Sequence, residues 1–204
     1  MNIVYVAGSP RIGGNSDTLA KYFLHCCQQQ GATIQHFHLN NLNYRGCQAC
    51  DACKKGADHC VLKDDLTPVL AAVFAADILV LATPVYYGDV TAQLKGFIDR
   101  TYSFLKPGYI AENKPSRFPK RKQLVFILAQ GHRNSKLFAD ILPRYSDIFY
   151  WTGFAKTWPL RAVDVYHRGD VDKKEEFFRQ AQQLSEQLMS DQNSADNITA
   201  TDQP

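Results

Sequence analysis

The sequence predicts an α/β fold in which a parallel β-sheet is covered by helices on both faces. Short apolar runs alternate five times with longer amphipathic segments, and this alternation is typical of consecutive strand–helix units. The apolar runs are rich in β-branched residues, as strands buried on both faces usually are. With 204 residues, of which 45% are hydrophobic and 21% charged, the chain has the size and composition of one globular domain.

Each expected strand is brief and ends at a turn or at the start of a helix. The first ends at Gly8-Ser9-Pro10, and the third is stopped by Thr83-Pro84. The five strands are expected at residues 3–7, 33–39, 78–82, 124–129 and 156–163, of which the last has the weakest pattern.

The expected helices show apolar residues at helical spacing, and two of their ends carry recognisable signals. Gly31 ends the first helix, and the pair Thr67-Pro68 supplies an N-cap and a first helical residue for the second. The helices are expected at residues 16–30, from 67 onward, 90–105, 136–150 and 171–189.

One domain is expected over residues 1–190, followed by a disordered polar tail at residues 191–204 that contains three Asp and no basic residue. The net charge of +3 is too small to indicate a nucleic-acid-binding protein. No apolar stretch approaches the length that spans a bilayer, and the first residues lack the basic region of a signal peptide. We therefore expect a cytoplasmic protein with no membrane or nucleic-acid partner.

Two connections are long enough to indicate a function or mobility. Residues 40–66 carry a group of cysteines where a helix would be expected, and residues 106–122 are rich in Pro, Lys and Arg. A solvated basic loop is the favoured interpretation of the second connection; the alternatives are docking of an acidic electron carrier or binding of the 2′-phosphate of NADPH. Its basic residues are Lys114, Arg117, Lys120, Arg121 and Lys122.

The turn after the first strand has the composition of a phosphate-binding loop. It leads directly into a helix, whose N-terminus offers unpaired N–H groups and the positive end of a dipole to an anion. Neither the Gly-x-Gly-x-x-Gly nor the Gly-Lys-Ser/Thr pattern is present, and Asp17 places a negative charge beside the proposed anion. Side chains that would add donors or charge are Ser9, Arg11, Asn15, Ser16 and Thr18.

Two motifs together resemble the NAD(P)H-dependent FMN reductases of the flavodoxin-like superfamily. They are Gly8-Ser9-Pro10-Arg11 with Gly14-Asn15-Ser16, and Thr83-Pro84-Val85-Tyr86-Tyr87-Gly88 followed by the segment 93–100. The resemblance implies a flavodoxin-like three-layer sandwich with strand order 2-1-3-4-5 and FMN at the tips of the first and third strands. It implies that the flavin ring lies against Pro84, Val85, Tyr86, Tyr87 and Gly88, with a third loop at Gln130 and Gly131. His132 is expected to face solvent, with an approach to the ring as the alternative.

Four of the six cysteines lie within fourteen residues, with three at intervals of three. Such compact spacing suits an iron–sulfur cluster better than zinc, and it resembles the iron–sulfur flavoprotein branch of the same family. The interpretations that stay open are a [4Fe–4S] cluster, a metal-free reduced or disulfide-forming remnant, and zinc. The candidate ligands are Cys47, Cys50, Cys53 and Cys60, while Cys26 and Cys27 are expected to be core thiols.

These features lead to the expectation of an FMN-dependent oxidoreductase that passes electrons between a donor, a [4Fe–4S] cluster and FMN. No catalytic side chain is expected, because the flavin supplies the chemistry. The alternatives are a cluster-free NAD(P)H-dependent FMN or quinone reductase and a non-catalytic electron carrier. The resemblance implies a small-molecule electron donor or acceptor, with NAD(P)H or ferredoxin as candidates, and assembly as a homodimer or homotetramer.

Overall fold

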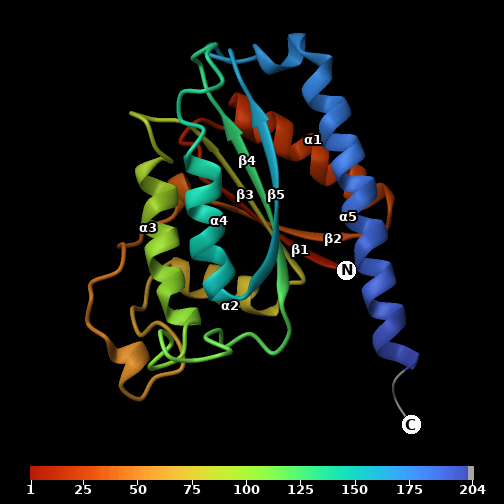
Figure 1. The fold of residues 1–204 in the computed structure, drawn as a ribbon. Helices are drawn as coiled ribbons and strands as arrows, with labels where there is room; N and C mark the ends of the chain where they lie inside the picture. Colours follow the sequence, from red (N-terminus) through yellow and green to blue (C-terminus); the bar gives the residue numbers. More distant parts are fainter. Residues whose placement is uncertain (202–204) are drawn as a thin grey trace.

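The computed structural model describes the backbone of residues 1–201 and the side chains of residues 1–191. It confirms the predicted fold: five parallel strands form one sheet in the order β2-β1-β3-β4-β5 (Figure 1). The strands are β1 (Asn2–Ala7), β2 (Thr33–His38), β3 (Ile78–Pro84), β4 (Lys122–Ala129) and β5 (Phe154–Ala162). The helices are α1 (Asn15–Gln29), α2 (Leu66–Ala75), α3 (Ala92–Arg100), α4 (Ile141–Thr152) and α5 (Glu175–Thr201), with short 3₁₀ turns at Leu39–Asn41, Ala52–Lys54, Thr101–Phe104 and Val171–Lys173.

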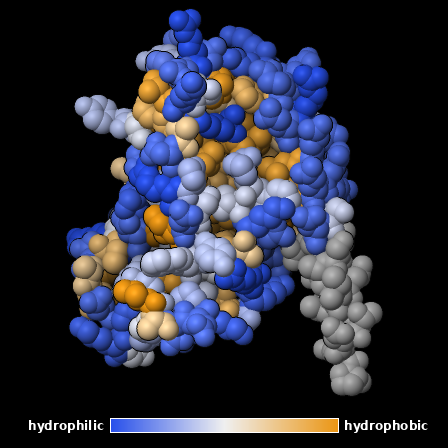
Figure 2. Space-filling view, in the orientation of Figure 1, coloured by the Kyte–Doolittle hydropathy of each residue, from blue (hydrophilic) through white to orange (hydrophobic). Residues whose placement is uncertain are grey.

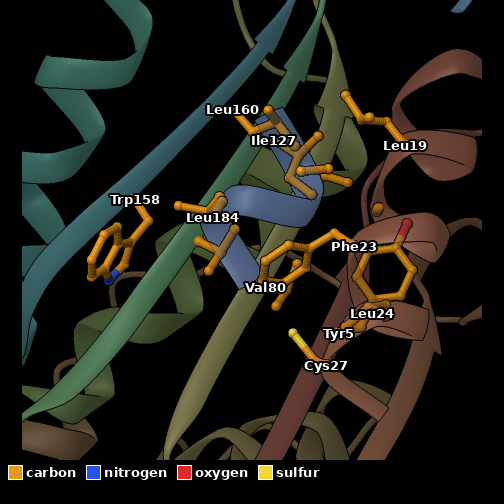
Figure 3. Packing of buried hydrophobic residues seen from close by; sticks show 14 of the residues in the cluster. Tyr5, Leu19, Phe23, Leu24, Cys27, Val80, Ile127, Trp158, Leu160 and Leu184 are labelled. Atoms are coloured by element: carbon orange, nitrogen blue, oxygen red, sulfur yellow. The ribbon is translucent and has the colours of Figure 1, made fainter. Parts of the chain in front are cut away.

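Helices cover both faces of the sheet and divide the core into two layers. Alternate residues of each central strand point to opposite faces, so Tyr5 and Val80 pack with α1 and α5, whereas Val6 and Leu81 pack with α2, α3 and α4. Figure 3 shows the first layer, in which Phe23 and Cys27 of α1 lie near Val80, and Leu160 of β5 lies near Ile127. Burial on both faces explains why β3 reads as a continuous apolar run.

The weak pattern of the fifth strand has a structural reason. β5 is nine residues long and pairs with β4 along its length, but it lies at the edge of the sheet, where exposed and buried residues mix irregularly. Its sequence therefore lacks the continuous apolar run of a central strand.

The helices begin one to five residues from the predicted positions, with α3 at Ala92 rather than 90 and α5 at Glu175 rather than 171, where Val171–Lys173 forms a 3₁₀ turn. Two of these differences, at α2 and α4, have a local cause. α2 begins at Leu66 because the Asp64 carboxylate accepts a hydrogen bond from the Leu66 N–H (3.1 Å), while the Thr67 hydroxyl donates to the Leu62 carbonyl (3.0 Å) and is no cap. α4 begins at Ile141 rather than residue 136, because Phe138 has a positive φ of 60° and Arg161 binds the carbonyl of Ser135.

Helix α5 extends into the segment for which the sequence predicts a disordered tail. Its backbone is helical through Thr201, whereas residues 202–204 lie outside the described residues. Continuing an existing helix needs no new nucleation, which is the costly step of helix formation. Across the described part of the chain, no helix combines the length and the apolar character needed to cross a membrane.

A buried carboxylate fixes the junction between β1 and α1. Asp17 is fully buried and accepts hydrogen bonds from the Tyr5 hydroxyl (2.9 Å), the Gly13 N–H (2.8 Å) and Lys21 Nζ (2.8 Å). Burial alone would raise the pKa of Asp17, but the hydrogen bonds from Lys21, Gly13 and Tyr5 outweigh it and hold this pKa below its ordinary value. The negative charge at this position is therefore compensated by groups of β1, the turn and α1.

We predict that Asp17→Asn lowers the free energy of unfolding by about 2 kcal/mol at pH 7, because hydrogen bonds to a charged acceptor are lost. Since the pKa of Asp17 is depressed in the folded state, its contribution is present above the ordinary carboxyl pKa and disappears as pH falls through the folded value. The difference between wild type and variant should therefore shrink below about pH 4 in urea titrations. Glu112→Gln, at an exposed loop position, is the control; an equal loss there would contradict the prediction.

Candidate functional site

A cavity of about 560 Å³ opens at the carboxyl ends of the central strands, which is where open α/β sheets bind ligands. Its volume falls within the range typical of small-molecule sites. The cavity is lined by every predicted cofactor-binding residue except Thr18, which lies one turn inside α1. The residues that line it belong to segments 9–16, 84–88, 129–132 and 165–168, together with Phe138.

The first wall of the cavity is the turn between β1 and α1. Ser9 is buried, and its hydroxyl oxygen accepts a hydrogen bond from the Arg11 N–H (3.1 Å), while the Gly14 N–H donates to the Arg11 carbonyl (3.2 Å). These bonds curl the turn so that the first N–H groups of α1 border the cavity, and such groups have no partner within the helix. The turn is thus shaped to receive an anion, with the guanidinium-bearing Arg11 beside it.

Two predicted ligand-binding side chains are instead engaged by the protein itself. The Asn15 amide donates to the carbonyls of Val165 (3.0 Å) and His167 (2.9 Å), and its oxygen accepts from the Val171 N–H (3.3 Å). The Gln130 amide donates to the carbonyls of the following loop and accepts from Arg161. Both residues line the cavity, but these contacts assign their side chains to holding loops in place.

The second wall is a two-residue turn after β3. Tyr86 and Asp89 exchange backbone hydrogen bonds (2.8 and 3.1 Å), and between them Tyr87 and Gly88 both have positive φ, of 51° and 86°. A non-glycine residue in this conformation costs about 1–2 kcal/mol, so the turn stores strain at Tyr87. The Tyr87 side chain is fully exposed and projects from the cavity rim.

The third and fourth walls include residues that the sequence analysis did not identify. A Cβ on Gly131 would lie 2.6 Å from Cδ2 of Tyr166, so only glycine lets the Tyr166 ring pack against this loop. His132 is exposed, as expected, and it also lines the cavity. The sequence did not identify Val165, Tyr166, His167 and Arg168, which also line the cavity. They follow the fifth strand, and because the carboxyl ends of parallel strands meet at one edge of the sheet, their position after that strand could have indicated them.

The lining of the cavity is basic. Among the described residues that surround it there are two arginines and two histidines but no carboxylate. Such a surface favours a ligand that carries negative charge.

The four predicted cysteine ligands lie together at the opposite end of α3. Cys47, Cys50, Cys53 and Cys60 line one small cavity of about 20 Å³. Cys47 and Cys50 are exposed, whereas the sulfur of Cys53 accepts from Lys54 Nζ (3.5 Å). The loop between them bends back on itself through positive φ values at Ala49 (50°) and Asp51 (55°).

The thiols agree with an iron–sulfur cluster in number and in order along the chain, but not in their arrangement here. In the described residues no group of three or more His, Cys, Asp or Glu side chains is arranged to hold a metal ion. The 20 Å³ space is about large enough for one water molecule, so the thiols as they lie here do not enclose enough room for a cluster. All six cysteines are free thiols.

The two other cysteines behave as predicted. Cys26 and Cys27 are buried in α1, and burial raises the pKa of the Cys27 thiol to about 12. At neutral pH this thiol is protonated and packs as a small apolar side chain.

Arg100 at the end of α3 anchors the cysteine loop. Its side chain is fully buried; Nε donates to the Cys60 sulfur (3.0 Å) and Nη1 to the Asp64 carboxylate (2.7 Å). Further hydrogen bonds reach the carbonyls of Arg45 (2.8 Å) and Leu62 (3.3 Å). Burial alone would raise the pKa of Asp64, but its hydrogen bond with Arg100 holds this pKa below the ordinary value. One guanidinium therefore ties both ends of the loop to α3.

The basic connection before β4 is largely occupied by internal contacts. Arg117 donates to the Cys53 carbonyl (2.8 Å), Lys120 pairs with Asp77 (2.8 Å), and Lys122 is buried. Lys122 lies at the amino end of β4, whose eight residues span about 23 Å before they reach the basic cavity. The basic connection and the basic cavity therefore lie at opposite edges of the sheet.

The model of a protein family described as NADPH-dependent FMN reductase matches residues 1–139. The chain belongs to this family. The resemblance inferred from the sequence is therefore confirmed, and it supports the prediction of a flavin-dependent oxidoreductase. The matched segment includes the first three walls of the cavity and all four cysteines, but neither β5 nor the loop at 165–168.

Two relatives of this chain are iron–sulfur flavoproteins. The protein from Methanosarcina thermophila is 32% identical over 114 residues, which cover 56% of this chain and 59% of that protein. The protein from Methanocaldococcus jannaschii is 34% identical over 105 residues, which cover 52% of each chain. The chain thus matches little more than half the length of these relatives.

Among solved structures, the NAD(P)H:quinone oxidoreductase from Methanothermobacter marburgensis has a similar fold. The TM-score is 0.74 over 92% of this chain and 96% of that chain, at 19% identity. At this identity the likeness supports the flavodoxin-like architecture alone.

We predict that Arg100→Met lowers the free energy of unfolding by about 3 kcal/mol, because it leaves Asp64 without its charged partner in a largely buried position. The matched control is Arg144→Met, since the Arg144–Asp89 pair is half exposed and should contribute no more than about 1 kcal/mol. Chemical denaturation followed by circular dichroism measures both. Equal effects of the two substitutions would contradict the anchoring role of Arg100.

Proposed function

We propose that the chain is an FMN-dependent oxidoreductase and that FMN occupies the basic cavity at the carboxyl edge of the sheet. The observation that carries the proposal is the cavity itself, where an anion-binding turn and a ring-sized wall meet in a volume of about 560 Å³. Bound FMN would supply hydride and single-electron chemistry that the side chains do not provide. The residues present fit this group, because the lining combines basic side chains with aromatic ones.

The residues around the cavity would bind and orient the flavin. The N–H groups at the start of α1, with Ser9, Ser16 and Arg11, would hold the phosphate. Pro84, Val85 and Tyr86 would shape the wall against the ring, while the turn at Tyr87 and Gly88 keeps this wall rigid. NAD(P)H is the proposed electron donor, in keeping with the family description.

We further propose that the four clustered cysteines bind a [4Fe–4S] cluster, which would supply single-electron transfer. Two observations support this: the four thiols share one cavity, and iron–sulfur flavoproteins are 32% and 34% identical to this chain over the matched segments. Ferredoxin then becomes an alternative donor to NAD(P)H. A second candidate is a cluster-free NAD(P)H-dependent FMN or quinone reductase. The positions of the thiols favour it, because in the described residues no three possible ligands are placed to hold one metal ion.

Assembly as a homodimer or homotetramer is part of the proposal. The cysteine loop and the turn that precedes α3 lie at opposite ends of this helix, whose nine residues are about 13 Å long (Figure 1). Figure 2 shows apolar residues reaching the surface on the face that carries α3 and α4, where Ile148 and Trp151 are half exposed. A second copy on this face would bury these side chains and shorten the path between thiols and flavin. A cytoplasmic location stays a prediction.

Protein purified without oxygen is expected to contain about one FMN and about four iron and four sulfide per chain. Flavin absorbance and iron and sulfide assays measure this content, and NADPH or reduced ferredoxin should bleach the flavin. FMN without iron would support the cluster-free reductase instead. Absence of FMN binding would contradict both candidates.

Cys47→Ser tests the cluster separately from the flavin. Because Cys47 is exposed, its replacement should leave the fold and the FMN content unchanged while the iron content falls to less than half of wild type. Cys26→Ser, in the first helix, is the matched control and should retain its iron. If both variants keep wild-type iron, these cysteines do not hold the cluster.

A further inference from the structure

We infer that Arg168, from the loop after β5, is a second arginine for the flavin phosphate and closes the phosphate site opposite Arg11. The inference rests on the proposed binding of FMN. Arg168 lines the basic cavity, and it lies outside the segment 1–139 that matches the family model.

The position of the guanidinium directs it to the phosphate end of the cavity. A Cβ placed on Gly13 would lie 2.9 Å from Nη2 of Arg168, so the guanidinium lies against the turn that precedes α1. The ring-side turn at Tyr87 and Gly88 belongs to a different wall, formed after β3. Arg168 can therefore reach an anion held by the first turn of α1.

The charge of the ligand calls for a second cation. A phosphate monoester carries a charge near −2 at neutral pH. The charge of Asp17 is balanced by its ion pair with Lys21, and no carboxylate occurs among the described residues that line the cavity. Arg11 would balance one of the two negative charges of the phosphate, and Arg168 would balance the other.

The loop that carries Arg168 is held in place before any ligand binds. The Asn15 side chain makes three hydrogen bonds to it, at Val165, His167 and Val171. The Asp170 carboxylate accepts from the His167 N–H (2.6 Å), and the Val165 N–H donates to the Gln130 carbonyl (3.0 Å). Such preorganisation lowers the entropy cost of ordering a charged side chain on binding. Asn15 is then a positioning residue for the phosphate site.

The test compares FMN with riboflavin, which has the same ring but no phosphate. Binding to apoprotein is measured by quenching of flavin fluorescence for wild type, Arg168→Gln and Arg168→Lys. Arg168→Gln should raise the Kd for FMN about tenfold, the effect of one charge-assisted hydrogen bond, and leave the Kd for riboflavin within about twofold. The Kd of Arg168→Lys for FMN should lie between those of wild type and Arg168→Gln, because lysine keeps the positive charge but lacks the planar guanidinium that binds a phosphate through two hydrogen bonds.

Arg133→Gln is the matched control, since Arg133 is an exposed arginine at the same edge that does not line the cavity. It should change neither Kd. Equal weakening of both flavins by Arg168→Gln, or no weakening of FMN, would overturn the assignment while FMN binding itself stands. If wild-type protein binds neither flavin, the proposed function fails and the assignment fails with it.

Discussion

Packing of Tyr44 and Gly46 against α3 places the cysteine loop at the far end of that helix. A Cβ on Gly46 would lie 3.7 Å from Cα of Gly96, and the Tyr44 hydroxyl donates to the Gln93 carbonyl on the same helix. The segment after β2 is therefore laid along α3 and leads the chain from the carboxyl edge of the sheet to the far end of that helix. The cysteine loop begins only after this crossing, so the basic cavity and the thiols are kept apart within one chain.

Helix α3 connects the two candidate sites mechanically. At its start, Thr91 caps the helix and donates to the Gly8 carbonyl (2.6 Å) in the phosphate-site turn. At its end, Arg100 contacts Cys60 and Asp64. A buried arginine is costly unless its donors are satisfied, so its five hydrogen bonds to the loop explain how a charge is tolerated there. Displacement of either end of α3 would be transmitted along a rigid helix.

The fold and three walls of the cavity could be predicted from the sequence because they depend on local patterns. Central strands are buried on both faces, and the Gly8–Ser16 and Thr83–Gly88 segments carry motifs in continuous stretches. The role of Asn15 could not be predicted, because its partners at Val165 and Val171 lie about 150 positions away in the sequence. The start of α4 was missed for the same reason: it depends on Arg161 of β5. Long-range side-chain contacts overrode local propensity in each case.

Backbone strain in this chain is concentrated at the two candidate sites. In the part of the chain that the structure describes, the non-glycine residues with positive φ are Ala49, Asp51, Tyr87, Phe138 and Asp164. The first two shape the cysteine loop, Tyr87 and Phe138 line the basic cavity, and Asp164 begins the loop that carries Arg168. Each such residue costs about 1–3 kcal/mol, which persists only where surrounding contacts enforce the conformation. The contacts of Asn15, Arg100 and Arg161 hold the loops that contain Ala49, Asp51, Phe138 and Asp164, so side-chain contacts between segments distant in sequence keep both sites in shape.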